Sequence, residues 1–168
     1  MTAGAHLTID SPVGRLTLSE RDGALVRLRW GEAERSAETS VLRTAAAQLS
    51  AYFFCELKRF ELPLDPDGTA FQLAVWEAMK AIPYGRTRTY GDLAGRTGAS
   101  ARAVGTACGR NPIPIIVPCH RVVAAGGRLG GFSGGAGPAT KRRLLALENA
   151  VPPALSAAGD KPVQGALF

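Results

Sequence analysis

The stretch that decides the fold of the C-terminal half runs from residue 89 to residue 109 and reads TYGDLAGRTGASARAVGTACG. It predicts two short helices, at about residues 90–96 and 100–109, separated by a turn around Gly98. Ser100 is a typical N-cap, because its hydroxyl can accept a hydrogen bond from a free amide in the first helical turn. Two short helices around a glycine-containing turn indicate a helix-turn-helix.

The second predicted helix has an unusually bare surface. Arg102 is its only charged residue, and most of its other residues are small: Ala101, Ala103, Gly105 and Thr106. Such a helix can lie close to a nucleic-acid duplex, or equally close to another helix. The motif alone leaves both interpretations open.

The charge distribution favours a polyanion as partner. The chain has 168 residues and a net charge of +6, and the segment from Arg86 to Arg143 contains ten Lys or Arg and one acid, Asp92. This segment therefore carries +9 and the remainder −3. A basic half beside an acidic half is typical of a nucleic-acid-binding surface, although a coding bias toward arginine would give the same counts.

The N-terminal part predicts a small antiparallel sheet. Alternating residues indicate strands at 6–10, 15–18 and 25–30, with a tight hairpin at Asp22-Gly23. A helix follows from about Ser40, with apolar residues at helical spacing: Leu42, Ala46, Leu49, Tyr52 and Phe53. Cys55, at the end of this helix, is interpreted as a small buried hydrophobic residue.

The fold class expected is α+β, with a small N-terminal antiparallel sheet and helix packed on a mostly helical C-terminal domain that contains the helix-turn-helix. The predicted boundaries are residues 1–62 for a scaffold domain, 63–68 for a Pro/Gly/Asp-rich linker, 69–150 for the second domain and 151–168 for a flexible tail.

A helix is predicted to open the second domain. Thr69 and Gln72 form a capping box. Its buried stripe is expected at Phe71, Val75, Met79 and Ile82. Trp76, one step off this stripe, is expected to pack against the first domain.

A reactive cysteine is predicted at Cys119. It follows a proline-rich extended segment, residues 111–118, and precedes a glycine-rich loop, residues 126–137. A thiol is nucleophilic only as a thiolate, so it needs a proton acceptor and positive charge nearby. His120 is adjacent, and Arg110, Arg121 and Arg128 lie in the same region.

Side chains of adjacent residues on an extended chain point to opposite sides, so a bridging water is expected between Cys119 and His120. The histidine then needs a carboxylate to orient it. From Cys119 onward the chain has only two acids, Glu148 and Asp160, and Asp160 lies in the predicted tail. Glu148 is the leading candidate, although an N-terminal acid could also fold in. The alternative for Cys119 is a buried structural cysteine.

Several classes of protein are disfavoured by composition. The three cysteines are widely spaced, there is no C-x-x-C pair and there are only two histidines, so neither disulfides nor a metal site is expected. No cofactor is expected. The sequence has no apolar run long enough to span a bilayer and no signal peptide at its start, which predicts a cytoplasmic protein without membrane contact.

The segment Ile115-Ile-Val-Pro-Cys-His-Arg-Val-Val123 resembles the active-site signature of the O6-alkylguanine-DNA alkyltransferases, the methylated-DNA–protein-cysteine methyltransferases. Further motifs follow in the order of that family: Phe71-Gln72 with Val75-Trp76, Ile82-Pro-Tyr-Gly85, Thr89-Tyr-Gly-Asp-Leu-Ala94, Arg102-Ala-Val-Gly105, Asn111-Pro112, Phe132-Ser-Gly-Gly135 and Lys141-Arg-Arg-Leu-Leu-Ala-Leu-Glu148. The likeness is strong over residues 69–150. Over the first 60 residues it is loose.

The resemblance implies a set of catalytic roles. Cys119 accepts the alkyl group, His120 takes its proton through a water, Glu148 orients His120, and Asn111 ties the two halves of the domain together beside the site.

The resemblance also implies the residues that contact the substrate. Tyr90 crowds the target phosphate and its hydroxyl donates to the ring as the base leaves, and Arg102 fills the gap left in the base stack. The pocket is completed by Pro114, Val122, Phe132 and Ser133. The DNA surface further includes Ala101, Ala103, Gly105, Thr106 and Arg121.

The implied activity is direct repair of DNA. The alkyl group of O6-alkylguanine, and less readily that of O4-alkylthymine, moves irreversibly to Cys119 after the nucleotide is flipped out of double-stranded DNA by a helix-turn-helix in the minor groove. The protein acts once, as a monomer, and cooperative binding along DNA is left open.

Two departures from the family pattern stand out. Phe132 replaces a tyrosine found in many members, and the N-terminal zinc ligands of some members are absent.

Three alternatives remain. A lesion sensor would bind DNA without repairing it, but such proteins lack the acceptor cysteine. A cysteine hydrolase would use Cys119, His120 and Glu148 for many turnovers. A transcriptional regulator would prefer a fixed DNA sequence.

Overall fold

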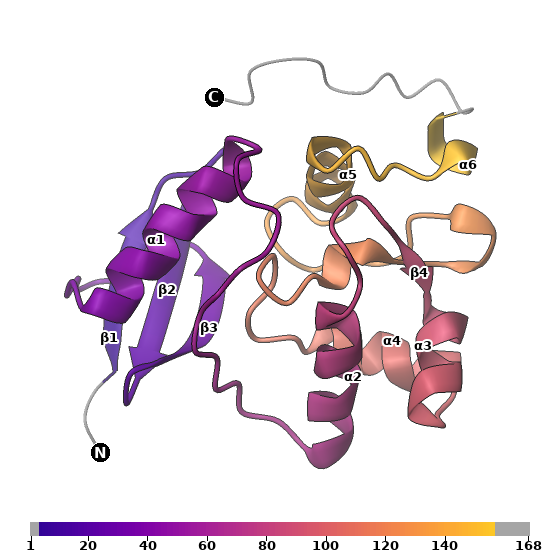
Figure 1. Ribbon diagram of the computed structural model, residues 1–168, viewed down its shortest axis with the longest axis horizontal. Coiled ribbons are helices and arrows are strands. Elements are labelled where there is room, and N and C mark those ends of the chain that lie inside the picture. Colours follow the sequence, from indigo (N-terminus) through magenta and orange to yellow (C-terminus); the bar gives the residue numbers. More distant parts are fainter. Residues whose placement is uncertain (1–3, 157–168) are drawn as a thin grey trace. The chain divides into compact units, whose positions relative to one another are not determined.

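The computed structural model describes residues 4–156, and the chain divides into two compact units with the boundary between Asp67 and Gly68 (Figure 1). The first unit is a sheet with one helix, and the second is mainly helical. The α+β class predicted from sequence is therefore confirmed. No helix among the described residues is long and apolar enough to cross a membrane.

The first unit contains a three-stranded antiparallel sheet in the order β1 (Ala5–Ile9), β2 (Leu16–Arg21), β3 (Ala24–Trp30). The predicted hairpin is confirmed between β2 and β3. Asp22 and Gly23 have φ of 52° and 81°, the left-handed conformations that a two-residue hairpin turn with the twist of its strands requires.

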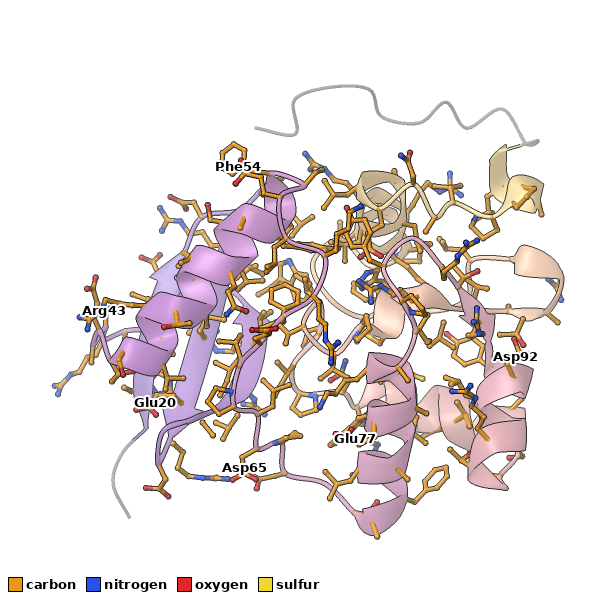
Figure 2. All side chains as sticks on the ribbon, viewed as in Figure 1. Glu20, Arg43, Phe54, Asp65, Glu77 and Asp92 are labelled. Atoms are coloured by element: carbon orange, nitrogen blue, oxygen red, sulfur yellow. The ribbon has the colours of Figure 1, made fainter. Side chains whose placement is uncertain are left out.

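Helix α1 (Ser40–Phe53) lies against this sheet, with Thr39 as its N-cap. Its buried residues are Leu42, Ala45, Leu49, Tyr52 and Phe53, so Ala45 replaces the predicted Ala46. The interpretation of Cys55 as buried is wrong. It lies beyond the end of the helix at φ 61° and is exposed, because the turn that ends α1 directs it away from the core. Phe54 beside it is also exposed and points outward in Figure 2.

The second unit places short elements around a compact core. They are α2 (Ala70–Lys80), β4 (Arg88–Thr89), α3 (Tyr90–Thr97), α4 (Ala101–Gly109), the 3-10 turns η1 (Cys119–Arg121) and η2 (Ala125–Gly127), β5 (Val122–Val123), α5 (Pro138–Leu147) and α6 (Pro153–Ser156). Strands β4 and β5 pair in parallel, which brings the start of α3 close to the end of η1.

The helix-turn-helix is present as predicted. Gly98 ends α3 with φ 70°, and the Ser100 hydroxyl accepts from the Ala103 amide to cap α4. Helix α3 starts with its own capping box, formed by Thr89 and Asp92, and Figure 2 shows Asp92 at this end. Helix α2 contacts both α3 and α4, so the motif is held on a third helix.

Helix α2 begins at the predicted capping box of Thr69 and Gln72, but its buried face is rotated. Val75, Trp76 and Met79 are buried, whereas Phe71 is 36% exposed. The indole N–H of Trp76 donates to the Ala107 carbonyl of α4 at 2.9 Å. The prediction of Phe71 in the buried stripe is therefore wrong, because α2 turns Trp76 toward α4.

The predicted flexible tail starts at residue 151, but its first residues are folded. Val151 packs against a cluster of Val123, Leu145 and Ala150, and α6 follows. The remainder of that prediction, residues 157–168 with Asp160, lies outside the described residues.

Candidate active site

Cys119 is the first residue of η1 and is only 9% exposed. Its amide donates to the Val117 carbonyl at 2.8 Å. Asn111 fixes the preceding segment from both sides: its Nδ2 donates to the same Val117 carbonyl at 2.8 Å, and its Oδ1 accepts from the Ile113 amide at 3.0 Å. The backbone that carries the sulfur is therefore braced.

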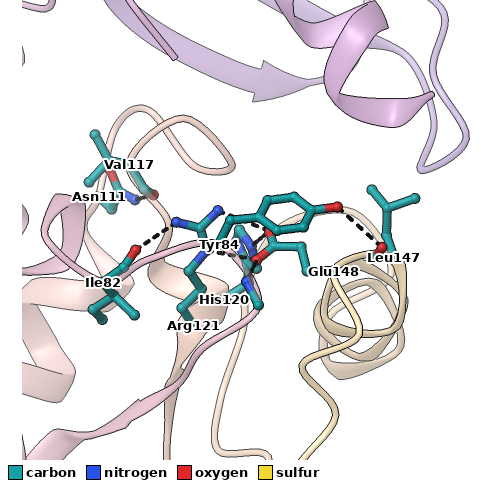
Figure 3. Close-up of polar contacts among 9 residues, drawn as sticks. Ile82, Tyr84, Asn111, Val117, His120, Arg121, Leu147 and Glu148 are labelled. Atoms are coloured by element: carbon teal, nitrogen blue, oxygen red, sulfur yellow. Dashed lines mark hydrogen bonds and ion pairs between the residues drawn. The ribbon is translucent and has the colours of Figure 1, made fainter. Parts of the chain in front are cut away.

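His120 is paired with Glu148, at the C-terminal end of α5. The distance between Nε2 and Oε2 is 2.6 Å and both side chains are completely buried (Figure 3). The other ring nitrogen, Nδ1, is buried and has no hydrogen-bond partner among the described residues. Because η1 is a 3-10 turn, the extended geometry expected at Cys119-His120 is wrong.

Arg121 occupies a structural position. Its Nε and Nη2 donate to the two oxygens of Glu148 at 2.8 and 3.2 Å, and its Nη1 donates to the Ile82 carbonyl at 2.8 Å (Figure 3). The residue is 6% exposed. Its assignment to the DNA surface is therefore corrected, since a guanidinium held in this way cannot reach a phosphate.

The electrostatics of this cluster define its protonation state. Burial alone would raise the pKa of Glu148, but the hydrogen bonds and positive charge of His120 and Arg121 lower it to about 2. Burial lowers the pKa of His120 despite the opposing effect of Glu148. At neutral pH the pair is thus an ionised carboxylate and a neutral imidazole.

This protonation state fixes the tautomer. Since the carboxylate can only accept, Nε2 carries the hydrogen and donates to Glu148, which leaves the lone pair on Nδ1. The imidazole therefore has one nitrogen able to take a proton.

Burial raises the pKa of the Cys119 thiol, and a hydrogen bond from Asn111 and the charge of Lys141 oppose this effect. The thiol is therefore protonated at rest and needs a base to become a nucleophile. The cluster supplies a candidate base in His120.

Tyr90, the first residue of α3, faces the glycine-rich loop and α4. A Cβ added at Gly130 would lie 3.1 Å from both Cε2 and the hydroxyl of Tyr90, and one added at Gly105 of α4 would lie 3.9 Å from its Cδ1. Burial raises the pKa of Tyr90 to about 12, so its hydroxyl stays protonated and can donate. Gly130 also has φ 74°. Both the close approach of Tyr90 and this left-handed backbone conformation favour glycine at the position.

The other predicted pocket residues lie on three separate segments. Pro114 is half-buried and forms a bridge with Val117, and Val122 is fully buried in β5. Phe132 is half-buried and Ser133 exposed, both in the loop before α5.

The predicted DNA surface on α4 is partly exposed. Ala101, Arg102 and Thr106 are exposed, whereas Ala103 and Gly105 are half-buried.

Lys141 is the residue that sequence reasoning missed. From the sequence it entered only the count of basic residues and, without a role, the start of one family motif. In the structure it is 1% exposed, and its ammonium donates to the Val122 carbonyl at 2.6 Å and the Gly131 carbonyl at 3.2 Å. Its spacing to Leu144 and Leu145 on the buried face of α5 is the one signal that could have indicated burial.

The described part of the chain contains no group of three or more His, Cys, Asp or Glu side chains placed to hold a metal ion.

Comparison with known proteins gives a consistent picture. Residues 70–150 match the family described as 6-O-methylguanine DNA methyltransferase, DNA binding domain, and residues 6–66 match its ribonuclease-like domain. The methylated-DNA–protein-cysteine methyltransferase of Mycolicibacterium paratuberculosis is 49% identical over 158 residues, which cover 89% of this chain and 94% of the relative. The constitutive enzyme of Bacillus subtilis is 40% identical over 142 residues, covering 77% and 86%.

Solved structures agree with these sequence relatives. The crystal structure of Mycobacterium tuberculosis OGT in complex with DNA is similar with a TM-score of 0.79 and 47% identity, covering 93% of this chain and 99% of that one. An O6-methylguanine DNA methyltransferase from Methanococcus jannaschii gives a TM-score of 0.62 at 30% identity, covering 85% and 93%.

Proposed function

The chain belongs to the 6-O-methylguanine DNA methyltransferase family, and from this premise we propose how the residues of its site carry out the transfer. The protein is a methylated-DNA–protein-cysteine S-methyltransferase, a DNA-repair protein with a DNA-binding domain. The acceptor in our proposal is Cys119. Its partners in the reaction are His120, Glu148 and Asn111.

The proton of the Cys119 thiol passes through one water to Nδ1 of His120. The imidazolium that forms is stabilised by the ionised Glu148 at 2.6 Å. Asn111 braces the backbone below the sulfur and hydrogen-bonds to it, which favours the thiolate. Burial of His120 keeps the base neutral and ready to accept.

The substrate in this proposal is O6-alkylguanine in double-stranded DNA, with O4-alkylthymine accepted less readily. The target base leaves the duplex because the sulfur is buried and cannot reach a stacked base. Helix α4 approaches the minor groove through its small residues Ala101, Ala103, Gly105 and Thr106, and Arg102 fills the gap in the stack.

Tyr90 crowds the neighbouring phosphate, and its protonated hydroxyl donates to a ring nitrogen of the departing guanine. The backbone at Val122 and Ser133 hydrogen-bonds to the edge of the guanine, and Pro114 forms one wall of the substrate pocket. Phe132 leaves the pocket without the hydroxyl that many relatives have at this position.

In the chemical step the sulfur forms a bond to the alkyl carbon while the bond from that carbon to O6 breaks. The electron pair of the broken bond stays with the guanine, which accepts a hydrogen bond from Tyr90 and takes up, through water, the proton that His120 received from the thiol. The product is a neutral thioether, and no group in the site is suited to cleave it. Each molecule is therefore expected to act once. We also expect it to act as a monomer.

A single observation carries this proposal. A buried cysteine lies one residue before a buried histidine whose Nε2 is fixed by a carboxylate and whose Nδ1 has no protein partner among the described residues. Such a group can deprotonate the thiol without competing contacts.

The test is a mass measurement. The protein is incubated with an oligonucleotide that carries a single O6-methylguanine, and the intact protein and its peptides are weighed. We expect one added methyl group on the Cys119 peptide and none on the peptides of Cys55 or Cys108. Cys119→Ser should abolish transfer and retain DNA binding.

The alternatives predict different results. A repaired oligonucleotide with unchanged protein mass would exclude self-transfer, and more than one repaired lesion per protein would indicate a hydrolase. Binding without any repair by the wild-type chain would indicate a lesion sensor.

A further inference from the structure

The ammonium of Lys141 lies inside the second unit without a carboxylate partner. No acidic side chain is within ion-pair distance of it in residues 4–156, and its two hydrogen bonds are to backbone carbonyls, those of Val122 and Gly131. A buried cation is normally paired, because removing a charge from water is costly. A charge retained here therefore calls for a role.

The surroundings of Lys141 include several titratable groups. Cys119 and His120 of η1, Tyr90 of α3 and Cys108 of α4 all lie close enough to interact with it, and its ammonium is 5.7 Å from the centre of the Tyr90 ring. Of these, only Cys119 becomes an anion in the proposed reaction.

The two carbonyls that Lys141 holds belong to different walls of the site. Val122 follows η1 directly, and Gly131 belongs to the glycine-rich loop that also carries Phe132 and Ser133. One ammonium therefore joins the segment of the acceptor cysteine to the loop across from it.

We propose that Lys141 is a positioning residue, whose buried ammonium favours the ionised form of Cys119 and joins the Val122 and Gly131 segments around the substrate base. This inference rests on the proposed function for its reference to the substrate, but the effect on Cys119 does not. When the proton leaves the sulfur, the thiolate of Cys119 becomes the negative partner that the ammonium of Lys141 lacks in the resting site. After alkylation the thioether is neutral, so Lys141 again has no negative partner at Cys119.

The physical chemistry agrees with this assignment. Burial lowers the pKa of Lys141 to about 8, while negative charge on Cys119 or Cys108 raises it. In turn, the charge of Lys141 lowers the pKa of Cys119. The effect is reciprocal, as coupling between two sites must be.

The experiment measures the pH dependence of Cys119 alkylation. Iodoacetamide is the probe, and the rate is followed on the Cys119 peptide by mass spectrometry, so that Cys55 and Cys108 do not interfere. Lys141→Gln keeps a donor for the two carbonyls but removes the charge, and Lys141→Arg keeps the charge. Lys80→Gln, at a partly exposed lysine of α2, is the matched control.

We expect Lys141→Gln to raise the midpoint of the profile by about one pH unit, a roughly tenfold slower reaction at pH 7. Lys141→Arg should restore most of the rate, and Lys80→Gln should leave the midpoint in place. A uniform slowing of Lys141→Gln at every pH, or an Arg variant as slow as the Gln variant, would overturn the proposal.

The wild-type chain provides a test that does not depend on the folding of a variant. Its rate should rise with pH and then flatten near pH 8, where Lys141 loses its charge; a rise through this region without a change of slope would also overturn the proposal. A parallel measurement of benzyl transfer from free O6-benzylguanine separates the two claims. If wild-type protein fails to accept the benzyl group, the proposed function fails, whereas the iodoacetamide profile still decides the role of Lys141.

Discussion

At the scale of single residues, Glu148 connects two other buried residues of the site, His120 and Arg121. Its two oxygens accept from the ring of His120 and from two nitrogens of Arg121, and all three side chains are buried. One carboxylate thus orients the proposed base and forms a buried ion pair with Arg121. We expect loss of its charge to affect both catalysis and stability.

Glu148→Gln should slow transfer from free O6-benzylguanine on the order of 100-fold, because the imidazolium of His120 loses its stabilising anion. It should also cost about 3–5 kcal/mol of unfolding free energy, since Arg121 becomes a buried unpaired cation. Rates from single-turnover assays and urea denaturation measure the two effects. Glu77→Gln, at an exposed acid of α2, is the control, and an equal loss in that variant would contradict a specific role.

Acid should destabilise the fold in a defined range. The pKa of Glu148 falls from 4.5 to about 2 on folding, so its contribution is present above pH 4.5 and is lost as the pH falls toward 2. The pKa of His120 is also lowered from 6.5, so stability begins to decline below that pH as the unfolded chain takes up a proton there. Urea unfolding at a series of pH values should give a free energy that falls throughout this range. A free energy independent of pH between 7 and 3 would contradict the burial of this pair.

The contact between His120 and Glu148 was predicted from the sequence and is present at 2.6 Å, but two cations were misjudged. The need of a histidine base for a carboxylate, and the scarcity of acids after Cys119, were enough to predict this pair. Arg121 and Lys141 were counted as surface charge, because a sequence does not show that a long cationic side chain turns inward to meet carbonyls or a carboxylate. That information lies in the tertiary fold.

At the scale of elements, several features that depend on neighbouring residues in the sequence were predicted correctly, whereas features that depend on tertiary packing were not. The capping box of Thr69 and Gln72, the turn at Gly98 and the hairpin at Asp22-Gly23 depend on neighbours in sequence, and all three were predicted. The capping box of Thr89 and Asp92 was not predicted. The buried face of α2 depends on where α4 lies, so Phe71 was placed wrongly. The turn η1 was also missed, because three prolines nearby favoured an extended chain.

Arg102→Ala tests the role of α4. We expect transfer from duplex DNA to fall about tenfold or more, while transfer from the free base O6-benzylguanine changes little, because only the duplex substrate needs the gap in its stack to be filled. Both rates are measured with the same preparation. Equal losses on the two substrates would remove the proposed flipping role.

Ser100→Ala tests the capping of the same helix. Its hydroxyl accepts from the Ala103 amide at 3.1 Å, and its loss should cost about 1 kcal/mol of unfolding free energy. Ser100→Asp, which restores an acceptor, should recover most of that stability but weaken binding to DNA through its negative charge. Denaturation and a DNA titration distinguish the two effects.

At the scale of the whole molecule, the chemistry and the basic charge belong to the same unit. All residues of the proposed site lie beyond Gly68, where the family's DNA-binding domain also matches, and the first unit has its own sheet and core. The division near residues 62–68 could be predicted because proline, glycine and aspartate accumulate there. Composition and charge thus indicated a DNA-binding half, but not which of its cations are available to DNA.

Binding to undamaged duplex should depend strongly on salt and little on sequence. Each phosphate neutralised by an exposed arginine contributes about −0.9 to the slope of log affinity against log salt. Titrations from 50 to 200 mM salt should give such a slope, and it should be unchanged in Arg121→Gln if that variant folds, because this guanidinium is internal. A reduced slope in the folded variant would show that Arg121 contacts a phosphate after all.

The position of Glu148 along the chain has a consequence for synthesis. During translation, Cys119 and His120 leave the ribosome well before Glu148. Arg121 also has no partner carboxylate until Glu148 has been added. A nascent polypeptide that stops before Glu148 therefore contains the proposed acceptor sulfur without the carboxylate proposed to orient His120. Any reactivity of Cys119 that depends on the pairing of His120 with Glu148 is therefore acquired only after Glu148 has been synthesised and has folded against the histidine.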